Sequence, residues 1–301
     1  MNKKKISILE VGPRDGFQNL KQFLPTEKKL EIIDGLISTG VTKMEITSFV
    51  SPKAIPQMAD AAEISRICTE KYPQLELYAL TPNRRGVENA YAAGVRHMSY
   101  VISVSEKHNM RNINRSHDQS FADLEQIIRD FPNVDITVGM ATALGCPFEG
   151  EQSVAKVVAF AERLWDAGVR KMYPADTIGV ADPGLVRRIV TALREALPEA
   201  ELQIHIHDTR GMGLVNTLAA IECGISTVQS TLGGLGGCPF APGASGNTAT
   251  EDLVYMLEKM GYDTGIDFDK LLALSKYQKS FVDGIYSGHQ ICINESKQPC
   301  C

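Results

Sequence analysis

Residues 202–211 read Leu-Gln-Ile-His-Ile-His-Asp-Thr-Arg-Gly, an alternating segment that runs into a turn. Alternation of apolar and polar residues is typical of a β-strand, on which side chains two residues apart point to the same side. The imidazoles of His205 and His207 should therefore project together from the carboxyl end of a strand, where α/β folds place their chemistry. A single buried histidine is usually a hydrogen-bonded structural residue, but a pair in this arrangement favours half of a metal site.

Other short apolar segments recur along the chain and alternate with amphipathic segments that have helical spacing. We predict strands at 6–11, 43–48, 75–80, 98–104, 135–142, 171–175, 202–207 and 227–232, and helices at 27–38, 152–167 and 183–196, among others. Asp182 is a candidate N-cap for the last of these helices, and Pro183 suits its first turn.

The alternation of strands and helices predicts a parallel sheet, and eight strands fit a closed (β/α)8 TIM barrel. An open doubly wound sheet is the alternative. That fold usually carries Gly-x-Gly-x-x-Gly after its first strand, whereas this chain has Gly12-Pro-Arg-Asp-Gly16 there. Helical patterns at 248–260 and 267–282 follow the eighth strand. We therefore expect one domain over 1–285, a TIM barrel with extra C-terminal helices, and a weakly ordered tail at 286–301.

The composition excludes several classes of protein. The chain has 301 residues, of which 44% are hydrophobic and 22% charged, as in an ordinary globular protein. Its net charge of −5 argues against a general nucleic-acid binder. The seven cysteines are odd in number and form no CxxC pair, which indicates reduced thiols. The sequence contains no apolar run of membrane-spanning length, and its start lacks the apolar segment of a signal peptide. We expect a cytoplasmic protein without nucleic-acid or membrane partners.

Polar residues follow several of the predicted strands, and in a barrel such residues share one rim. They are Arg14, Asp15, Glu45, Asp176, His205 and His207, with Cys238 and Asn247 in the loop after the last strand. Their convergence suits an active site. Structural alternatives remain open for most of them: Arg14 could pair with an acidic neighbour, and Asp15 could cap a turn. Asn247 could cap the helix that follows, and Cys238 could be an inert apolar residue.

The carboxylate of Asp15, the imidazoles of His205 and His207 and the amide oxygen of Asn247 would together form a mixed oxygen and nitrogen site. Without a thiolate, this set suits Mg2+ or Mn2+ better than structural zinc. Four protein ligands would leave room for a substrate hydroxyl and carboxylate, and a metal lowers the pKa of a bound hydroxyl. We interpret the glycine-rich segment 233–246 as a mobile lid that carries a thiol.

Five motifs together resemble the 3-hydroxy-3-methylglutaryl-CoA lyase family. They are Gly12-Pro-Arg-Asp-Gly16, Glu45-Ile-Thr-Ser-Phe-Val-Ser-Pro-Lys53, Asp176-Thr-Ile-Gly179, His205-Ile-His-Asp-Thr209 and Gly234-Leu-Gly-Gly-Cys-Pro239, the last followed by Gly243-Ala-Ser-Gly-Asn247. The resemblance extends from Ile8 to Met260 in matching order. The cysteine-bearing glycine loop distinguishes this lyase from other metal-dependent TIM-barrel lyases and synthases.

The resemblance implies a role for each matched position. Asp15, His205, His207 and Asn247 would ligate a divalent cation, and Arg14 would neutralise the enolate oxygen of the thioester. Glu45 and Asp176 would orient groups and assist proton transfer, while Cys238 would act in acid–base chemistry. The substrate would be an acyl-CoA thioester, cleaved in a retro-Claisen reaction to acetyl-CoA and acetoacetate. The family also suggests a homodimer.

One departure from the family pattern leaves the acyl substrate open. Before Asp176 the family usually has Ser-Leu-Gly, whereas this chain has Tyr173-Pro-Ala175. A related thioester such as citramalyl-CoA is therefore an alternative substrate. A condensing synthase of the isopropylmalate or homocitrate type is a second alternative, although such enzymes usually carry a further C-terminal domain, and only about forty residues follow Gly261. A metal-binding protein without catalysis is the third.

Overall fold

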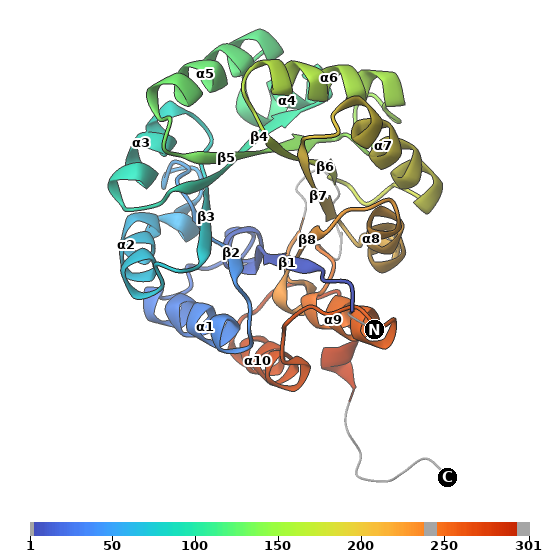
Figure 1. Cartoon of the computed structure of the whole chain (residues 1–301). Coiled ribbons are helices and arrows are strands. Elements are labelled where there is room, and N and C mark those ends of the chain that lie inside the picture. The colour runs from blue at the N-terminus through green and yellow to red at the C-terminus, as the bar shows by residue number, and fades with distance from the viewer. Residues whose placement is uncertain (1–2, 238–245, 294–301) are drawn as a thin grey trace.

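Eight parallel strands close into a barrel in the order β1 to β8, with β1 paired to β8 (Figure 1). The computed structural model describes residues 3–237 and 246–293. The strands are β1 Ser7–Glu10, β2 Lys43–Ser48, β3 Glu76–Leu80, β4 His97–Ser103, β5 Asp135–Ala141, β6 Lys171–Asp176, β7 Glu201–Ile206 and β8 Thr227–Ser230. The predicted TIM barrel is confirmed, and the open sheet is excluded.

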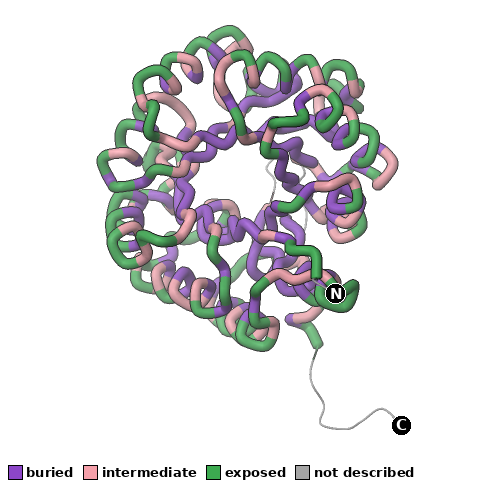
Figure 2. The backbone as a smooth tube through the Cα atoms, in the orientation of Figure 1, coloured by how far each residue is buried: buried purple, intermediate pink, exposed green. Residues whose placement is uncertain are grey.

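Helices surround the barrel and bury one face each against it. They are α1 Thr26–Ser38, α2 Ala61–Lys71, α3 Arg84–Ala92, α4 Glu106–Ile113, α5 His117–Asp130, α6 Val154–Asp166, α7 Pro183–Ala196 and α8 Gly213–Glu222. Figure 2 shows the buried strands inside a ring of helices with exposed outer faces. In α7 the buried residues include Val186, Ile189 and Leu193, at the spacing of one helical face. Asp182 caps α7 as predicted, because its side chain accepts hydrogen bonds from two backbone N–H groups of the first turn.

Two further helices follow the barrel, α9 Thr250–Lys259 and α10 Phe268–Phe281, and α10 packs against both α9 and α1. A short 3-10 helix, η4 Gln290–Cys292, comes next. The backbone N–H groups of His289 and Gln290 donate to the carboxylate of Asp252 at 2.7 and 2.8 Å. These bonds attach residues 289–290 to α9, within the segment 286–301 for which we predict weak order. Residues 294–301 lie outside the described part of the chain.

The first loop of the barrel is shaped by a buried carboxylate at the end of β1. Glu10 Oε1 accepts hydrogen bonds from the backbone N–H groups of Gly12 and Leu232, at 2.7 and 2.9 Å, and Oε2 accepts one from Thr250 Oγ1. A Cβ atom on Gly12 would lie only 2.5 Å from Glu10 Oε1, which explains the glycine. The chain then forms the π-helix η1, Gly12–Gly16, which carries Arg14 and Asp15 to the carboxyl end of the barrel.

Among the described residues, no helix combines the length and the apolar character that a membrane crossing requires.

Candidate metal centre and active site

Three potential metal ligands converge at the carboxyl end of the barrel. Asp15 comes from η1, while His205 lies on β7 and His207 directly follows that strand. Their ligand atoms all lie within 4.8 Å of one another. The ring centroids of the two histidines are 5.0 Å apart, and both residues are buried. The spacing of two residues along a strand has therefore produced the predicted pair of neighbouring imidazoles.

Asn247 completes this cluster from the other end of the chain. Its Nδ2 atom donates a hydrogen bond to Asp15 Oδ2 at 2.7 Å. Within the described residues, its Oδ1 atom and the Nδ1 atom of His207 are buried without a hydrogen-bond partner. A buried polar atom without a partner is costly, so these atoms fit a cation as their missing partner. The alternative role for Asn247 as a helix cap is wrong, because the N-cap of α9 is Ala249.

A glutamine on the neighbouring strand β8 bonds to the Nδ1 atom of His205 and fixes the orientation of the imidazole. His205 Nδ1 lies 3.1 Å from Gln229 Oε1, and Gln229 Nε2 donates to Gln203 Oε1 at 3.2 Å. Since Gln229 Oε1 must accept, Nδ1 carries the hydrogen and Nε2 keeps its lone pair for a cation. Burial lowers the pKa of His205 to about 3 and also lowers the pKa of His207. Both imidazoles are therefore neutral near pH 7, as metal ligation requires.

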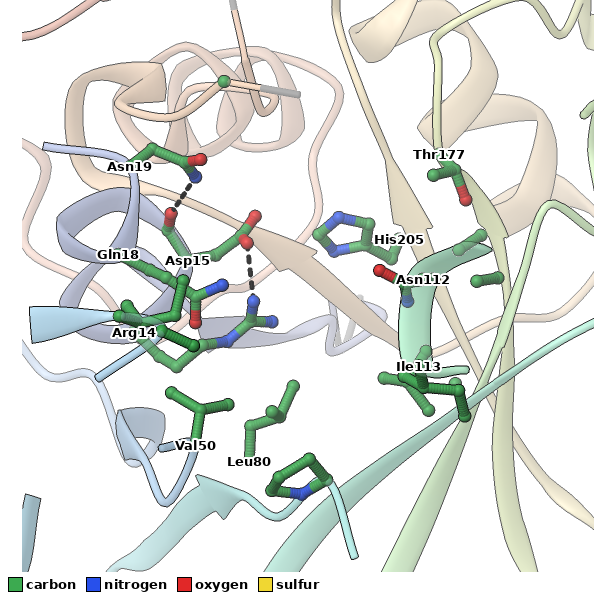
Figure 3. A pocket seen from close by; sticks show the side chains of 18 of the residues that line it. Arg14, Asp15, Gln18, Asn19, Val50, Leu80, Asn112, Ile113, Thr177 and His205 are labelled. Carbon is green, nitrogen blue, oxygen red and sulfur yellow. Dashed lines mark hydrogen bonds and ion pairs between the residues drawn. The ribbon is translucent and has the colours of Figure 1, made fainter. Parts of the chain in front are cut away.

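Arg14 joins two acidic residues, Asp15 and Glu45, at the edge of the cluster. Figure 3 shows its contact with Asp15. Its Nε atom donates to Glu45 Oε2, and its NH1 group lies 2.5 Å from Asp15 Oδ1. Burial alone would raise the pKa of Asp15, but the positive charge of Arg14 outweighs it, with help from the imidazoles, and brings that pKa to about 2. Asp15 is thus an anion at neutral pH. The expected pairing of Arg14 occurs with both acids, and it holds the guanidinium beside the ligand cluster.

Asp176 has different surroundings. Its two carboxylate oxygens accept hydrogen bonds from the backbone N–H groups of Val180 and Ala181, at 2.9 and 3.0 Å. Burial raises the pKa of this carboxyl group to about 6. Asp176 thus organises the loop after β6, and the close group of ligand atoms does not include it. Cys238 lies outside the described residues.

The cluster opens into a cavity of about 960 Å³, a size that is typical of small-molecule sites. Arg14, Asp15, His205 and His207 line one end of it. Most of the other walls come from β2 to β6 and the loops after them, and they mix apolar and polar side chains. These lining residues include the apolar Ile55, Val101 and Ala141 and the polar Arg115. Figure 3 labels four others, Val50, Leu80, Asn112 and Ile113.

The sequence did not lead us to predict two residues of this site. Gln229 orients His205, and Tyr173 lines the cavity beside the ligand cluster. A polar glutamine in the apolar segment of the eighth strand was a usable signal for the first. For Tyr173 the signal was its departure from the family pattern before Asp176, although the sequence alone gave no direction for the ring.

A closed barrel that brings a carboxylate and two neutral imidazoles together beside a large cavity, with an amide bonded to the carboxylate, is typical of metal-dependent TIM-barrel enzymes. The family model described as HMGL-like matches residues 5–277, and the chain belongs to this family.

Named relatives agree with this assignment. The chain is 45% identical over 271 residues to the mitochondrial hydroxymethylglutaryl-CoA lyase of Rattus norvegicus, an alignment that covers 89% of this chain and 83% of the relative. It is 42% identical to hydroxymethylglutaryl-CoA lyase YngG of Bacillus subtilis, over 91% of this chain and 92% of the relative. Among solved structures, an HMG-CoA lyase of Acinetobacter baumannii in complex with coenzyme A and 3-methylmalate superposes with a TM-score of 0.92. That pair is 37% identical and covers 99% of this chain and 98% of the other.

Proposed function

We propose that this protein is a divalent-metal-dependent carbon–carbon lyase that cleaves 3-hydroxy-3-methylglutaryl-CoA to acetyl-CoA and acetoacetate. The observation that carries the proposal is the 42–45% identity to hydroxymethylglutaryl-CoA lyases over about nine-tenths of the chain. The complex of the Acinetobacter relative with coenzyme A supports an acyl-CoA thioester as the substrate. Both points favour the lyase over a condensing synthase or a metal-binding protein without catalysis.

Asp15, His205, His207 and Asn247 would hold the cation, which we propose to be Mg2+ or Mn2+. The support is chemical: one carboxylate, two neutral imidazoles and an amide oxygen without a partner form a set of oxygen and nitrogen donors. When bound, the cation would supply Lewis acidity that lowers the pKa of the substrate hydroxyl.

Arg14 would act on the charge that develops during cleavage. When the C3 hydroxyl loses its proton, the C2–C3 bond breaks, the C3 oxygen becomes the ketone of acetoacetate, and the electron pair moves to the thioester as an enolate. A guanidinium beside the enolate oxygen stabilises charge that is absent from the ground state. Glu45 would keep Arg14 in position through its contact with Nε.

The enolate then needs a proton at carbon to become the acetyl group of acetyl-CoA. We propose the thiol of Cys238 as the acid, since a thiol with an ordinary pKa near 8.5 is a usable donor. Asp176 would assist by holding the loop after β6, because its carboxylate already accepts two N–H groups of that loop.

Location and assembly are also part of the proposal. The cysteine composition supports a cytoplasmic protein, and the curated relatives include one cytoplasmic lyase of Mus musculus as well as mitochondrial lyases. We propose a homodimer on the basis of the family resemblance alone.

The test is an assay of purified protein with Mg2+ and two thioesters. We expect acetoacetate and acetyl-CoA from 3-hydroxy-3-methylglutaryl-CoA at a much higher kcat/KM than pyruvate and acetyl-CoA from citramalyl-CoA.

Exchange of Arg14 for Met should lower kcat by about 10²–10³-fold, as the loss of an oxyanion donor does. The matched control is Arg170→Met, which removes an arginine that stacks on Trp165. Unchanged turnover in Arg14→Met would remove Arg14 from the mechanism. Release of free CoA from acetyl-CoA and a 2-keto acid would favour the synthase.

A further inference from the structure

Tyr173 lies on β6 three residues before Asp176. Its side chain lines the cavity together with Arg14, Asp15 and His205, although the residue is only 5% exposed. A large ring therefore lines the cavity beside the candidate metal-binding cluster.

The ring fits because the neighbouring strand has no side chain at the matching position. Tyr173 is paired in register with Gly139 of β5. A Cβ atom on Gly139 would lie 2.5 Å from the hydroxyl oxygen of Tyr173 and 2.6 Å from its Cζ atom. The ring thus extends across β5 into space that any other residue at 139 would occupy. Tyrosine at 173 and glycine at 139 are sterically matched.

Further contacts fix the orientation of the ring. Gln229 of β8, the residue that bonds to His205, lies close enough to the hydroxyl of Tyr173 to influence its pKa. The centroids of the Tyr173 and His205 rings are 6.2 Å apart. Burial raises the pKa of Tyr173, and the negative charge of Glu45 raises it further, so the phenol is neutral. The ring therefore packs over Gly139 of β5 and beside His205 of β7, and these neighbours restrict its movement.

We propose that Tyr173 determines the acyl specificity of the enzyme, because its ring, packed over Gly139, closes the acyl pocket beside the metal-binding cluster. The pocket then accepts the 3-hydroxy-3-methylglutaryl group and rejects longer or bulkier 3-hydroxyacyl groups. This inference rests on the proposed lyase function and deepens it. A rigid wall discriminates between substrates by size. In such pockets, one additional methylene group on the substrate lowers kcat/KM by about 10–200-fold.

The experiment compares three thioesters: 3-hydroxy-3-methylglutaryl-CoA, the homologue with one more methylene before the distal carboxylate, and the homologue with ethyl at C3. The readout is the ratio of kcat/KM for each homologue to kcat/KM for the first substrate. Tyr173→Ser should raise at least one ratio by about tenfold or more. Tyr173→Phe keeps the ring, so its ratios should stay at the parent values. The matched control is Tyr100→Phe, which removes the hydroxyl of another buried tyrosine, one that bonds to Asp123.

Each outcome decides the inference. Unchanged ratios in a Tyr173→Ser enzyme that still cleaves the first substrate would overturn it, and so would ratios in Tyr173→Phe that rise as much as in Tyr173→Ser. If circular dichroism shows that Tyr173→Ser does not fold, Tyr173→Leu replaces it in the test. The kcat/KM ratios of Tyr173→Leu should rise as well, but by less. Unchanged ratios in Tyr173→Leu would also overturn the inference. A parent enzyme that cleaves none of the thioesters would instead refute the lyase function, and this inference with it.

Discussion

Gln229 fixes the orientation of His205, although Gln229 is outside the candidate metal-binding cluster. Its Oε1 atom accepts the Nδ1 hydrogen of His205, which leaves the opposite ring nitrogen free for a cation. The partner of Gln229, Gln203, lies on the same strand as His205. The three side chains form a chain of hydrogen bonds between β7 and β8, and this chain fixes both the tautomer and the direction of the imidazole.

Replacement of Gln229 by Leu should lower the affinity for Mn2+ by about 10–100-fold, the usual effect of losing a group that orients a metal ligand. Isothermal titration calorimetry of the parent and the variant would measure it. Gln278→Leu is the matched control, because Gln278 is a buried glutamine whose side chain bonds to the backbone of Leu232. An affinity in Gln229→Leu equal to that of the parent would show that His205 needs no orienting partner.

Single residues were predictable from the sequence where local geometry decides their position. The spacing of His205 and His207 along one strand was sufficient to place their imidazoles together. The role of Gln229 was not predictable in this way, because it depends on the register between β7 and β8. The direction of Tyr173 likewise depends on the absence of a side chain at Gly139 on another strand. Contacts across strands require the register, which the sequence pattern alone does not provide.

At the scale of elements, the apolar segments predicted the strands well because each barrel strand is buried on both faces. The prediction at 43–48 coincides with β2, and that at 183–196 coincides with α7. The π-helix η1 was not predicted, since Gly12-Pro-Arg-Asp-Gly16 has no periodic pattern. Its path follows from Glu10, which binds the N–H groups of Gly12 and of the distant Leu232.

The carboxyl group of Glu10, which holds the first loop of the barrel, should make the stability of the fold depend on pH. Burial raises the pKa of Glu10 from 4.5 to about 7, so between these values the folded protein keeps a proton that the unfolded chain releases. The stability contributed by this group is complete below about pH 4.5 and is lost as the pH rises through about 7. Glutamine cannot ionise, so Glu10→Gln should gain stability relative to the parent over this window, by up to about 1.4 kcal/mol per pH unit.

Urea unfolding of the parent and of Glu10→Gln at several pH values would measure this difference. Glu258→Gln, at an exposed position of α9, is the matched control and should track the parent. A difference between Glu10→Gln and the parent that stays constant from pH 4.5 to 7 would contradict the expectation.

For the whole molecule, a cation at the cluster would connect η1, β7 and the segment before α9. A ligand that binds only the folded state stabilises it, by about 2.7 kcal/mol at a concentration of 100 Kd. We expect Mg2+ or Mn2+ to raise the thermal midpoint of unfolding by several degrees and a chelator to reverse the rise, as measured by calorimetry. His207→Ala should lose the effect.

His97→Ala is the matched control for this measurement. His97 pairs with Asp135, and the two residues begin β4 and β5 at the opposite end of the barrel. A thermal shift that persists in His207→Ala, or disappears equally in His97→Ala, would place the cation elsewhere.

The hydrogen bond between Asp15 and Asn247 joins residues that are 232 positions apart, next to the seam where β1 meets β8. During synthesis on the ribosome, the amino-terminal half of the cluster emerges long before its carboxyl-terminal partner. A nascent chain that is released early would lack Asn247 and the strand that closes the ring. Translation products that end before residue 247 would therefore lack part of the candidate cluster.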